Sequence, residues 1–402
     1  MVKTNSISPI RNPFESFWMA GFECTDKLNC LGNRVDFLSV TGHLDKLDED
    51  YKNIGQLGFK TVREGIRWSI VEKSPYQYEW SAVEKILRFA KKHTIQVLWD
   101  ICHFGFPVDL SPMHPAFSKR FAELCRAFVR FYRTINPEET LVVTPFNEVS
   151  FLAWLGGQVG GTSPFCIHYG VEVKYRLMRA FIEGVEVIKQ EDNNTRIMLT
   201  EPLVNMVPPL NATKKEIEFA AVCNESQFEV FEILSGRMYP ELRGKPEYVD
   251  IIGCNYYYNN QWLAGTTDFL PWVNAEGDPR IIPLHMLIEN LYNRYKRPIV
   301  ISETSHPKED RPQWMTMIAE QSKIVLEKNI PLWGICWYPV LDRPDWDYPQ
   351  LPWHNAGIWD INPDDKNLTR VLHEPTANAM LEAQAQLGKI VDRAQHTTMF
   401  QV

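Results

Sequence analysis

The sequence contains no run that approaches 18 consecutive apolar residues, the length that a helix needs to cross a membrane. The N-terminal segment, M-V-K-T-N-S-I-S-P-I-R-N-P, also lacks the continuous apolar core of a secretory signal peptide. These two absences predict a soluble, cytoplasmic protein without a membrane partner. The sequons at Asn211 and Asn367 then have no meaning as glycosylation sites, because glycosylation requires secretion.

An excess of basic residues is also missing. The chain has 42 Lys and Arg against 50 Asp and Glu, a formal net charge of −8 and a pI near 5.8. Proteins that bind nucleic acids or anionic membranes usually present a basic surface. The composition therefore predicts no nucleic-acid partner, whereas it leaves the oligomeric state open.

The motifs of metal and cofactor sites are absent as well. None of the eight cysteines belongs to a C-x-x-C pair, so we predict eight free thiols and no metal-binding cluster. No H-E-x-x-H motif occurs. The segment G-G-Q-V-G-G at 156–161 lacks the Lys-Ser/Thr of a phosphate-binding loop. We expect neither a metal nor a cofactor.

Apolar runs of strand length alternate eight times with segments whose apolar residues recur at helical spacing. The predicted strands lie near 17–22, 61–68, 95–103, 141–147, 197–201, 249–257, 299–303 and 332–337, and the predicted helices near 44–54, 81–90, 117–128, 173–185, 214–234, 287–295, 314–326 and 374–387. Such alternation requires parallel strands with right-handed crossovers, and eight units close into a (β/α)₈ TIM barrel. No linker divides the chain, so 1–402 is predicted to be a single catalytic domain, with a frayed tail at 392–402.

Polar or aromatic residues stand at the carboxyl end of every predicted strand. They are Glu23, Arg63, His103, Glu148, Glu201, Asn255, Glu303 and Trp337. An open doubly wound sheet, the alternative fold, uses one switch point, whereas a barrel brings all of its strand ends to one mouth. This pattern favours the barrel.

Two of these strands end in a glutamate: T-P-F-N-E at 144–148 and I-V-I-S-E at 299–303. A partly desolvated carboxyl at a strand mouth holds a proton near neutral pH and can act as a general acid. Taken alone, Asn147 and Glu148 also fit a turn that faces water. Two such strand ends in one barrel predict a pair of catalytic carboxylates.

The motifs V-R-E-G-I-R-W-S, I-C-H-F-G-F-P, T-P-F-N-E, G-C-N-Y-Y (which contains Asn255) and I-S-E-T occur in the order found in retaining glycoside hydrolases of clan A. Together they resemble family 1 most closely, over about residues 15–350. The resemblance implies a β-glycosidase that forms a covalent glycosyl-enzyme. It assigns Glu148 as the acid/base, Glu303 as the nucleophile, Arg63 and Tyr257 as partners of the nucleophile, and Asn147 as the partner of the sugar 2-hydroxyl.

The resemblance also implies sugar contacts. His103 matches the family's histidine that contacts the sugar 3-hydroxyl, and Trp337 matches the tryptophan that forms the floor of the sugar subsite. Glu23 stands where the family has a glutamine that contacts two hydroxyls. Asp345 and Trp346 match the residues that contact the 4- and 6-hydroxyls. A cis peptide bond is expected between Trp337 and Tyr338. Arg63 and His103 also have interpretations that involve no substrate. Arg63 could pair with a glutamate of the core, and His103 could be a strand-end histidine bonded to the backbone. Glu201 remains open as a third carboxylate near substrate.

The sequence departs from the family in three places. Val149 replaces the proline after the acid, Thr304-Ser305 replaces Asn-Gly after the nucleophile, and the segment 338–346 is one residue longer. We expect a cytoplasmic retaining β-glycosidase for small soluble glycosides, with carboxyl groups about 5 Å apart. The alternatives are a catalytically inactive carbohydrate-binding barrel and a transglycosidase that uses the same two carboxylates.

Overall fold

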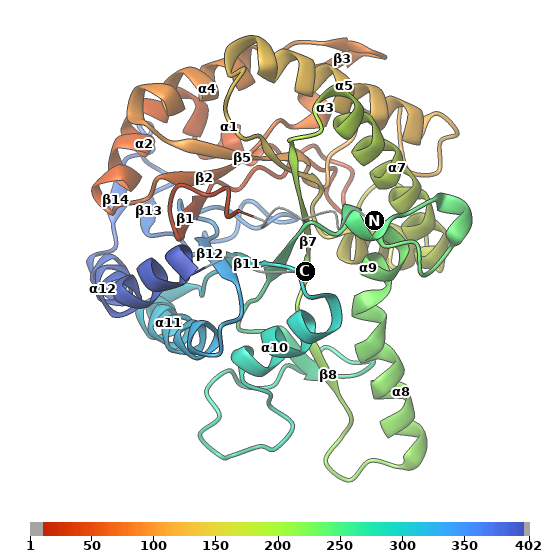
Figure 1. Cartoon of the computed structure of the whole chain (residues 1–402), viewed down its shortest axis with the longest axis vertical. Coiled ribbons are helices and arrows are strands. Elements are labelled where there is room, and N and C mark those ends of the chain that lie inside the picture. Colours follow the sequence, from red (N-terminus) through yellow and green to blue (C-terminus); the bar gives the residue numbers. More distant parts are fainter. Residues whose placement is uncertain (1–10, 398–402) are drawn as a thin grey trace, which may run out of the picture.

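The computed structural model describes residues 11–397 and shows a closed eight-stranded parallel barrel (Figure 1). Around the barrel the strand order is β1-β12-β11-β9-β7-β6-β5-β2. The bounds are β1 Trp18–Gly21, β2 Thr61–Gly65, β5 Gln96–Cys102, β6 Val142–Phe146, β7 Arg196–Pro202, β9 Ile251–Asn255, β11 Ile299–Thr304 and β12 Leu332–Trp337. The prediction of a (β/α)₈ barrel is confirmed, and the doubly wound alternative is wrong.

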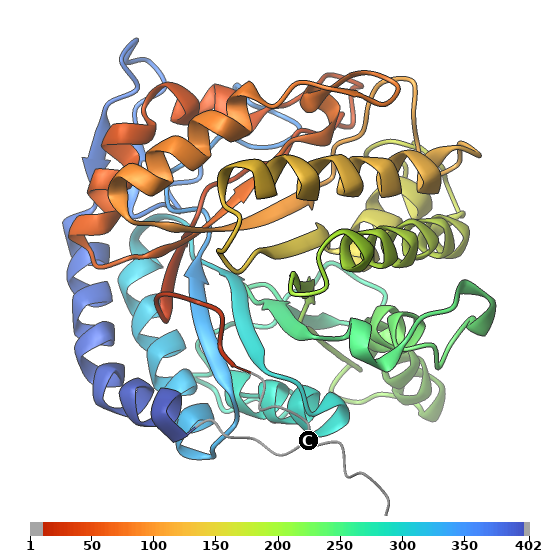
Figure 2. The ribbon, with the colours of Figure 1, turned by 45° about the horizontal axis from the view of Figure 1, so that its top comes forward.

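The helices surround the strands, as Figure 2 shows. They are α1 Phe37–Val40, α2 Leu47–Gln56, α3 Trp68–Val71, α4 Ser81–His93, α5 Phe117–Ile135, α6 Val149–Leu152, α7 Gly170–Glu191, α8 Lys214–Glu225, α9 Glu229–Leu234, α10 Leu284–Tyr295, α11 Arg311–Glu327 and α12 Glu374–Thr397. The predicted helix 214–234 is divided into α8, a 3₁₀ turn and α9. Residue 392 falls within α12, and 398–402 lie outside the described residues.

Three two-stranded ribbons decorate the barrel: β3 (Glu72–Ser74) with β4 (Gln77–Tyr78), β8 (Asn205–Val207) with β10 (Gln261–Leu263), and β13 (Trp359–Ile361) with β14 (Arg370–Leu372). The strand predicted to reach Trp68 ends at Gly65 instead, because Arg67 adopts a left-handed φ of 59° and α3 begins directly after it. These additions occupy the connections and leave the barrel intact.

Side chains of the barrel strands divide into an inner and an outer layer. The inner cluster contains Met19, Leu98, Val142, Met198, Ile251, Val300, Trp333, Cys336 and Tyr338. Residues of the opposite parity, such as Ile197 and Leu199 on β7, pack outward against the helices. This alternation decides which polar residues at the strand ends face the mouth.

The pairing of β12 with β11 skips a residue, because Ile299 is paired with Leu332 and Val300 with Gly334. The extra residue, Trp333, reverses the inward and outward parity along the rest of β12. Cys336 and Tyr338 consequently face inward, while Trp337 belongs to the outer core. The bulge therefore changes which aromatic ring reaches the mouth.

All eight cysteines lie in the described part of the chain and are free thiols, as predicted. Cys102, Cys254 and Cys336 are buried in or at the end of strands. Within residues 11–397, none of the helices has the length and apolar character that a membrane span requires.

Candidate active site

Glu303, at the end of β11, is held by two neighbours. Arg63 Nη1 donates to Glu303 Oε1 at 2.6 Å, and the Tyr257 hydroxyl donates to Oε2 at 2.9 Å. Arg63 is fully buried, and the charges of its carboxylate partners outweigh burial and raise its pKa well above the ordinary value. A guanidinium and a phenol hydroxyl thus bind separate oxygens of Glu303 and fix the orientation of its carboxyl group. Arg63 and Tyr257, both named from the sequence, thus contact the same carboxyl group.

Asp100 on β5 is a central residue of the site that the sequence reasoning missed. It accepts from Arg63 Nε at 3.0 Å and lies 2.8 Å from Arg63 Nη2 through its second oxygen. The same second oxygen lies 2.7 Å from His103 Nδ1. Burial would raise the pKa of Asp100, but Arg63 and His103 together lower it. A charged residue inside the apolar run I-Q-V-L-W-D-I-C was the signal that could have found it.

Asn147 connects the arginine to the histidine. Its Oδ1 accepts from Arg63 Nη2 at 2.8 Å, and its Nδ2 lies 3.2 Å from His103 Nε2. Because an amide has one accepting and one donating end, these two contacts fix its orientation. Asn147 and His103 are both buried at the barrel mouth, where the sequence placed them.

Glu148 is half-buried and follows β6 in a left-handed conformation with φ of 47°. Its Oε1 accepts from Asn255 Nδ2 at 2.8 Å, and Asn255 Oδ1 in turn accepts from the Ser302 hydroxyl at 2.7 Å. Burial, followed by the charge of Glu303, raises the pKa of the Glu148 carboxyl well above its ordinary value, although Asn255 opposes the shift. Burial and the neighbouring carboxylate thus favour the protonated form of Glu148, whose carboxyl is held by Asn255.

Glu23 lies beside this cluster as part of an ion-paired group. Its Oε1 accepts from the Thr25 hydroxyl at 2.6 Å, and its Oε2 lies 3.1 Å from Arg343 Nε. Burial would raise the pKa of Glu23, but Arg343 and His103 lower it. His103 Nε2 lies 3.7 Å from Glu23 Oε1, and the carboxylates raise the pKa of His103 against the effect of burial. Arg343 is a second member of the site that the sequence reasoning did not identify.

The structure does not bring Trp337 into the mouth. The side chain is 0% exposed in the outer core, and its indole N–H donates to the Ala356 carbonyl at 3.1 Å. Tyr338 faces the site instead, with its ring stacked on His103 at 5.7 Å between centroids and with Arg63 5.1 Å from its centroid. The parity change at Trp333 is the physical reason.

The expected cis peptide bond between Trp337 and Tyr338 is wrong. The cis bond lies one residue later, between Tyr338 and Pro339. A proline nitrogen makes the cis form far less costly than it is before another residue.

Asp345 and Trp346 lie in the loop after β12. Asp345 Oδ1 accepts from the backbone N–H groups of Asp347 and Tyr348, both at 2.9 Å, so this oxygen holds the loop. Trp346 has Lys27 at 5.2 Å and Arg343 at 5.4 Å from its ring centroid. Its buried indole N–H has no hydrogen-bond partner in the structure. Arg343 thereby connects Trp346 with Glu23.

A third group of strand-end residues has donor atoms that are close enough to hold a metal ion. Cys24, Asp100 and His103 present ligand atoms within 4.8 Å of one another, the one such group found among residues 11–397. The Asp100 carboxylate already carries the guanidinium of Arg63 on both oxygens, and a cation there would face that positive charge. The donor set therefore fits an ion-pair network better than a metal site.

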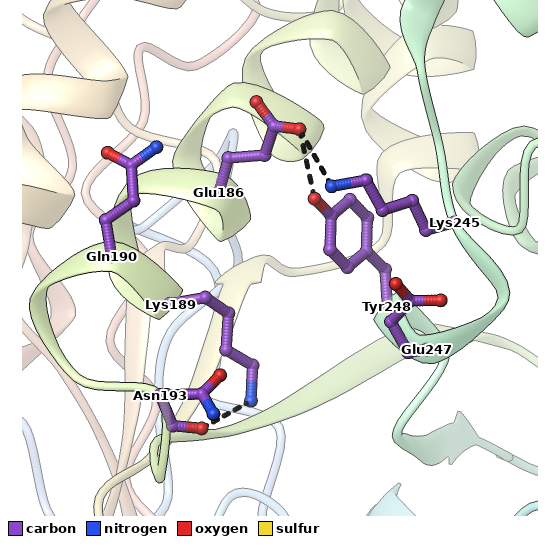
Figure 3. A pocket seen from close by; sticks show the side chains of 7 residues that line it. All are labelled: Glu186, Lys189, Gln190, Asn193, Lys245, Glu247 and Tyr248. Atoms are coloured by element: carbon purple, nitrogen blue, oxygen red, sulfur yellow. Dashed lines mark hydrogen bonds and ion pairs between the residues drawn. The ribbon is translucent and has the colours of Figure 1, made fainter.

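A cavity of about 540 Å³ lies elsewhere, between the end of α7 and the segment that precedes β9 (Figure 3). Its lining residues are Glu186, Lys189, Gln190, Asn193, Lys245, Glu247 and Tyr248. These residues precede the first residues of β7 and β9, so the cavity lies on the amino-terminal side of these strands, away from Glu148 and Glu303 at their carboxyl ends. Its lysines are bonded locally, Lys189 to the carbonyls of Asn193 and Thr195 and Lys245 to Glu186.

Comparison with known proteins gives structural matches only. No protein-family model and no curated protein sequence matches the chain. A family 1 β-glucosidase from Thermotoga maritima superposes with a TM-score of 0.72 at 16% identity, covering 95% of this chain and 99% of that chain. The β-glycosidase from Thermosphaera aggregans superposes with a TM-score of 0.73 at 14% identity, covering 98% and 100%. The chain therefore shares the fold of these β-glycosidases.

Proposed function

We propose that this protein is a retaining β-glycosidase that hydrolyses small soluble β-glycosides and belongs to the family 1 type. One observation supports the proposal most strongly. Glu303 is bonded to Arg63 and Tyr257, whereas the pKa of Glu148 is raised by burial and by the charge of Glu303. Two carboxyls whose environments separate their protonation states are suited to act as nucleophile and acid.

In the first step the ionised Glu303 attacks the anomeric carbon, and the bond to the leaving oxygen breaks as Glu148 gives that oxygen a proton. The product is an ester between the sugar and Glu303. Because the ester carries no charge, the repulsion that raised the pKa of Glu148 disappears. The Glu148 carboxylate then takes a proton from water, which attacks the anomeric carbon and restores Glu303.

The neighbouring polar groups suit the binding of a sugar. Asn147, His103 and Glu23 are buried at the same mouth and are oriented by Arg63, Asp100 and Thr25 respectively. Groups held in place before binding need less ordering when a ligand arrives. The structural likeness to β-glucosidases agrees with a glycoside substrate.

The structure gives no reason to favour an inactive sugar-binding barrel. Burying Glu148 next to the carboxylate of Glu303 is unfavourable for folding, and a protein that only binds sugar has no use for such a pair. We regard hydrolysis as the activity that explains both carboxyls.

The test is a screen of nitrophenyl β-glycosides that carry several sugars, followed by proton NMR of the first product. We expect dye release with at least one sugar and a product that retains the β-configuration. An initial α-product, or a measured separation of about 9 Å between the two carboxyl groups, would indicate inversion. Failure to release dye from any glycoside, together with sugar binding, would support the inactive barrel.

A further inference from the structure

Glu201 is a buried strand-end carboxylate that the mechanism above does not use. On β7, Met198 faces the barrel interior while Ile197 and Leu199 face the outer core, so Glu201 follows the outward parity. Its side chain is 2% exposed. Glu201 therefore lies between the barrel wall and the helices, and it does not face the mouth where substrate would bind.

The contacts of Glu201 lead to the candidate acid. Both of its oxygens accept from the backbone N–H of Ser150, at 3.1 and 3.3 Å. Ser150 is the second residue of α6, and Glu148 is the residue that caps this helix. The first N–H groups of a helix have no partner within the helix, so a carboxylate is well placed to accept from one of them.

The backbone at Glu148 needs such support, because φ of 47° and ψ of 63° is unfavourable for any residue with a side chain. Strand β7 supports it on both sides. The N–H of Glu148 donates to the Thr200 carbonyl at 3.0 Å, and two residues later the N–H of Ser150 donates to Glu201. Two adjacent residues of one strand thus hold the turn that aims the acid.

Charge provides a second connection. The negative charge of Glu201 is among the groups that raise the pKa of Glu148, after burial and Glu303. Burial raises the pKa of Glu201 itself to about 7, against the N–H groups of Ser150 and Val149 and the charge of Lys174. Lys174 on α7 is paired with Glu229 at 2.6 Å.

We propose that Glu201 is a positioning residue for the acid/base, acting on Glu148 through the first turn of α6 and through its charge rather than through substrate. The inference depends on the proposed function, because it assigns Glu148 the role of proton donor. It accounts for a buried carboxylate that has no place in the sugar site.

Two substitutions separate the two contributions. Glu201→Ala removes the acceptor and the charge, whereas Glu201→Gln keeps an acceptor oxygen and removes only the charge. Glu218→Gln, on the exposed surface of α8, makes the same chemical change at a distant position (Figure 1). Each variant is assayed with a dinitrophenyl glycoside, whose leaving group needs no proton, and with an alkyl glycoside, whose leaving group does.

We expect Glu201→Ala to lose about 10-fold or more in kcat/KM on the alkyl glycoside and little on the dinitrophenyl glycoside, since only the first depends on a well-aimed acid. Glu201→Gln should restore most of this loss and shift the alkaline limb of the pH profile to lower pH, because a nearby negative charge is gone. Glu218→Gln should behave as the unmodified enzyme.

Equal losses on both substrates in Glu201→Ala would show a general structural role and overturn the proposal. An unchanged alkaline limb in Glu201→Gln would overturn the contribution of charge. If Glu201→Ala does not fold, the pH profile of Glu201→Gln decides: a shift of the alkaline limb to lower pH supports the action of Glu201 on Glu148, and an unchanged limb overturns it. If the unmodified protein hydrolyses neither glycoside, the proposed function fails. The coupling between Glu201 and Glu148 is then still testable by carboxyl ¹³C NMR, which measures the pKa of Glu148 in the unmodified protein and in Glu201→Gln. The Glu148 signal is assigned by its loss in Glu148→Gln.

Discussion

The buried carboxyls of the site make the stability of the protein depend on pH. Replacing Arg63 with methionine should reverse the direction of that dependence. Arg63 is fully buried and is paired with two carboxylates. Its Nη1 lies 2.6 Å from Glu303 Oε1, and its Nε and Nη2 lie 3.0 and 2.8 Å from the two oxygens of Asp100. It also donates to Asn147 at 2.8 Å. Methionine keeps much of the length of the side chain but removes the charge and every donor. Two buried carboxyls then remain without their main partner.

The expected destabilisation is large. Breaking a buried ion pair by removing one partner typically costs about 3–5 kcal/mol, because the other charge stays buried. The entropy of unfolding is about 2.1 cal/mol/K per residue. Dividing the lost free energy of unfolding by this entropy, summed over the chain, gives a fall in Tm of about 4–6 °C. The loss should be largest at pH 8, well above the pKa of Asp100, where the charge of this buried carboxylate has lost its main partner.

The direction of the pH effect follows from the carboxyl pKa values. In the unmodified protein Arg63 and His103 hold the pKa of Asp100 below its ordinary value, so the stability that this carboxyl contributes is present above the ordinary value and is lost as the pH falls below it. Without Arg63, we expect burial to raise the pKa of Asp100 above its unfolded value, so that stability is lost as the pH rises. The Tm difference between Arg63→Met and the unmodified protein should therefore grow from pH 4.5 to pH 8.

Thermal melts followed by circular dichroism at pH 4.5, 6 and 8 measure this difference. Arg179→Met is the matched control, because Arg179 is 61% exposed and forms a surface pair with Glu183. Such exposed pairs contribute about 0–1 kcal/mol, so the control should stay close to the unmodified protein at every pH. A loss in Arg63→Met that is equal at all three pH values, or no larger than that of the control, would refute the account of the ion pair.

Four further predictions concern the carboxyls and the absence of a metal requirement. Glu303→Ala should lose activity by several powers of ten on every substrate, because no glycosyl-enzyme forms. Glu148→Ala should still release dinitrophenol in a burst followed by a slow phase, which azide should accelerate; a burst in Glu303→Ala instead would mean that the roles are reversed. Prolonged incubation with EDTA should leave activity unchanged, since carboxyls fill both catalytic roles, and recovery of lost activity by a divalent ion would contradict this. Because the pKa of Glu201 is about 7 in the fold and ordinary when unfolded, its ionisation lowers stability as the pH rises from about 4.5 to 7. The Tm of Glu201→Gln relative to the unmodified protein should thus increase over that range, and a constant difference would show that Glu201 titrates normally.

Much of the fold was predictable because barrel strands and helices have different periodicities. Apolar runs such as Ile299–Ile301 and the helical stripe of Phe117, Phe121 and Phe128 are local features, and the structure places a strand and a helix there. The less accurate boundaries lie where local signals conflict. The strand that begins at Thr61 was predicted to run toward Trp68, but β2 ends at Gly65 and the left-handed Arg67 precedes α3.

The site was predictable where the chemistry of one residue and its place at a strand end agreed. Glu303, Arg63, Tyr257 and Asn147 are connected by hydrogen bonds through Arg63 and Glu303. Trp337, which the family resemblance assigned to the floor of the sugar subsite, lies in the outer core instead, because the bulge at Trp333 changes the parity of β12. Glu201 has the same sequence signature as Glu148, a glutamate after an apolar run, yet it faces the outer layer.

The sequence by itself determined the eightfold alternation of strands and helices and the polar residues at the strand ends, because both depend on the order and type of neighbouring residues. The tertiary structure alone decided which of those residues share one mouth. The bulge at Trp333 turned Tyr338 inward in place of Trp337, and the closure of the barrel brought Asp100 and Arg343 to Arg63 and Glu23. Register and closure depend on pairing between strands far apart in the chain, so no local pattern specifies them.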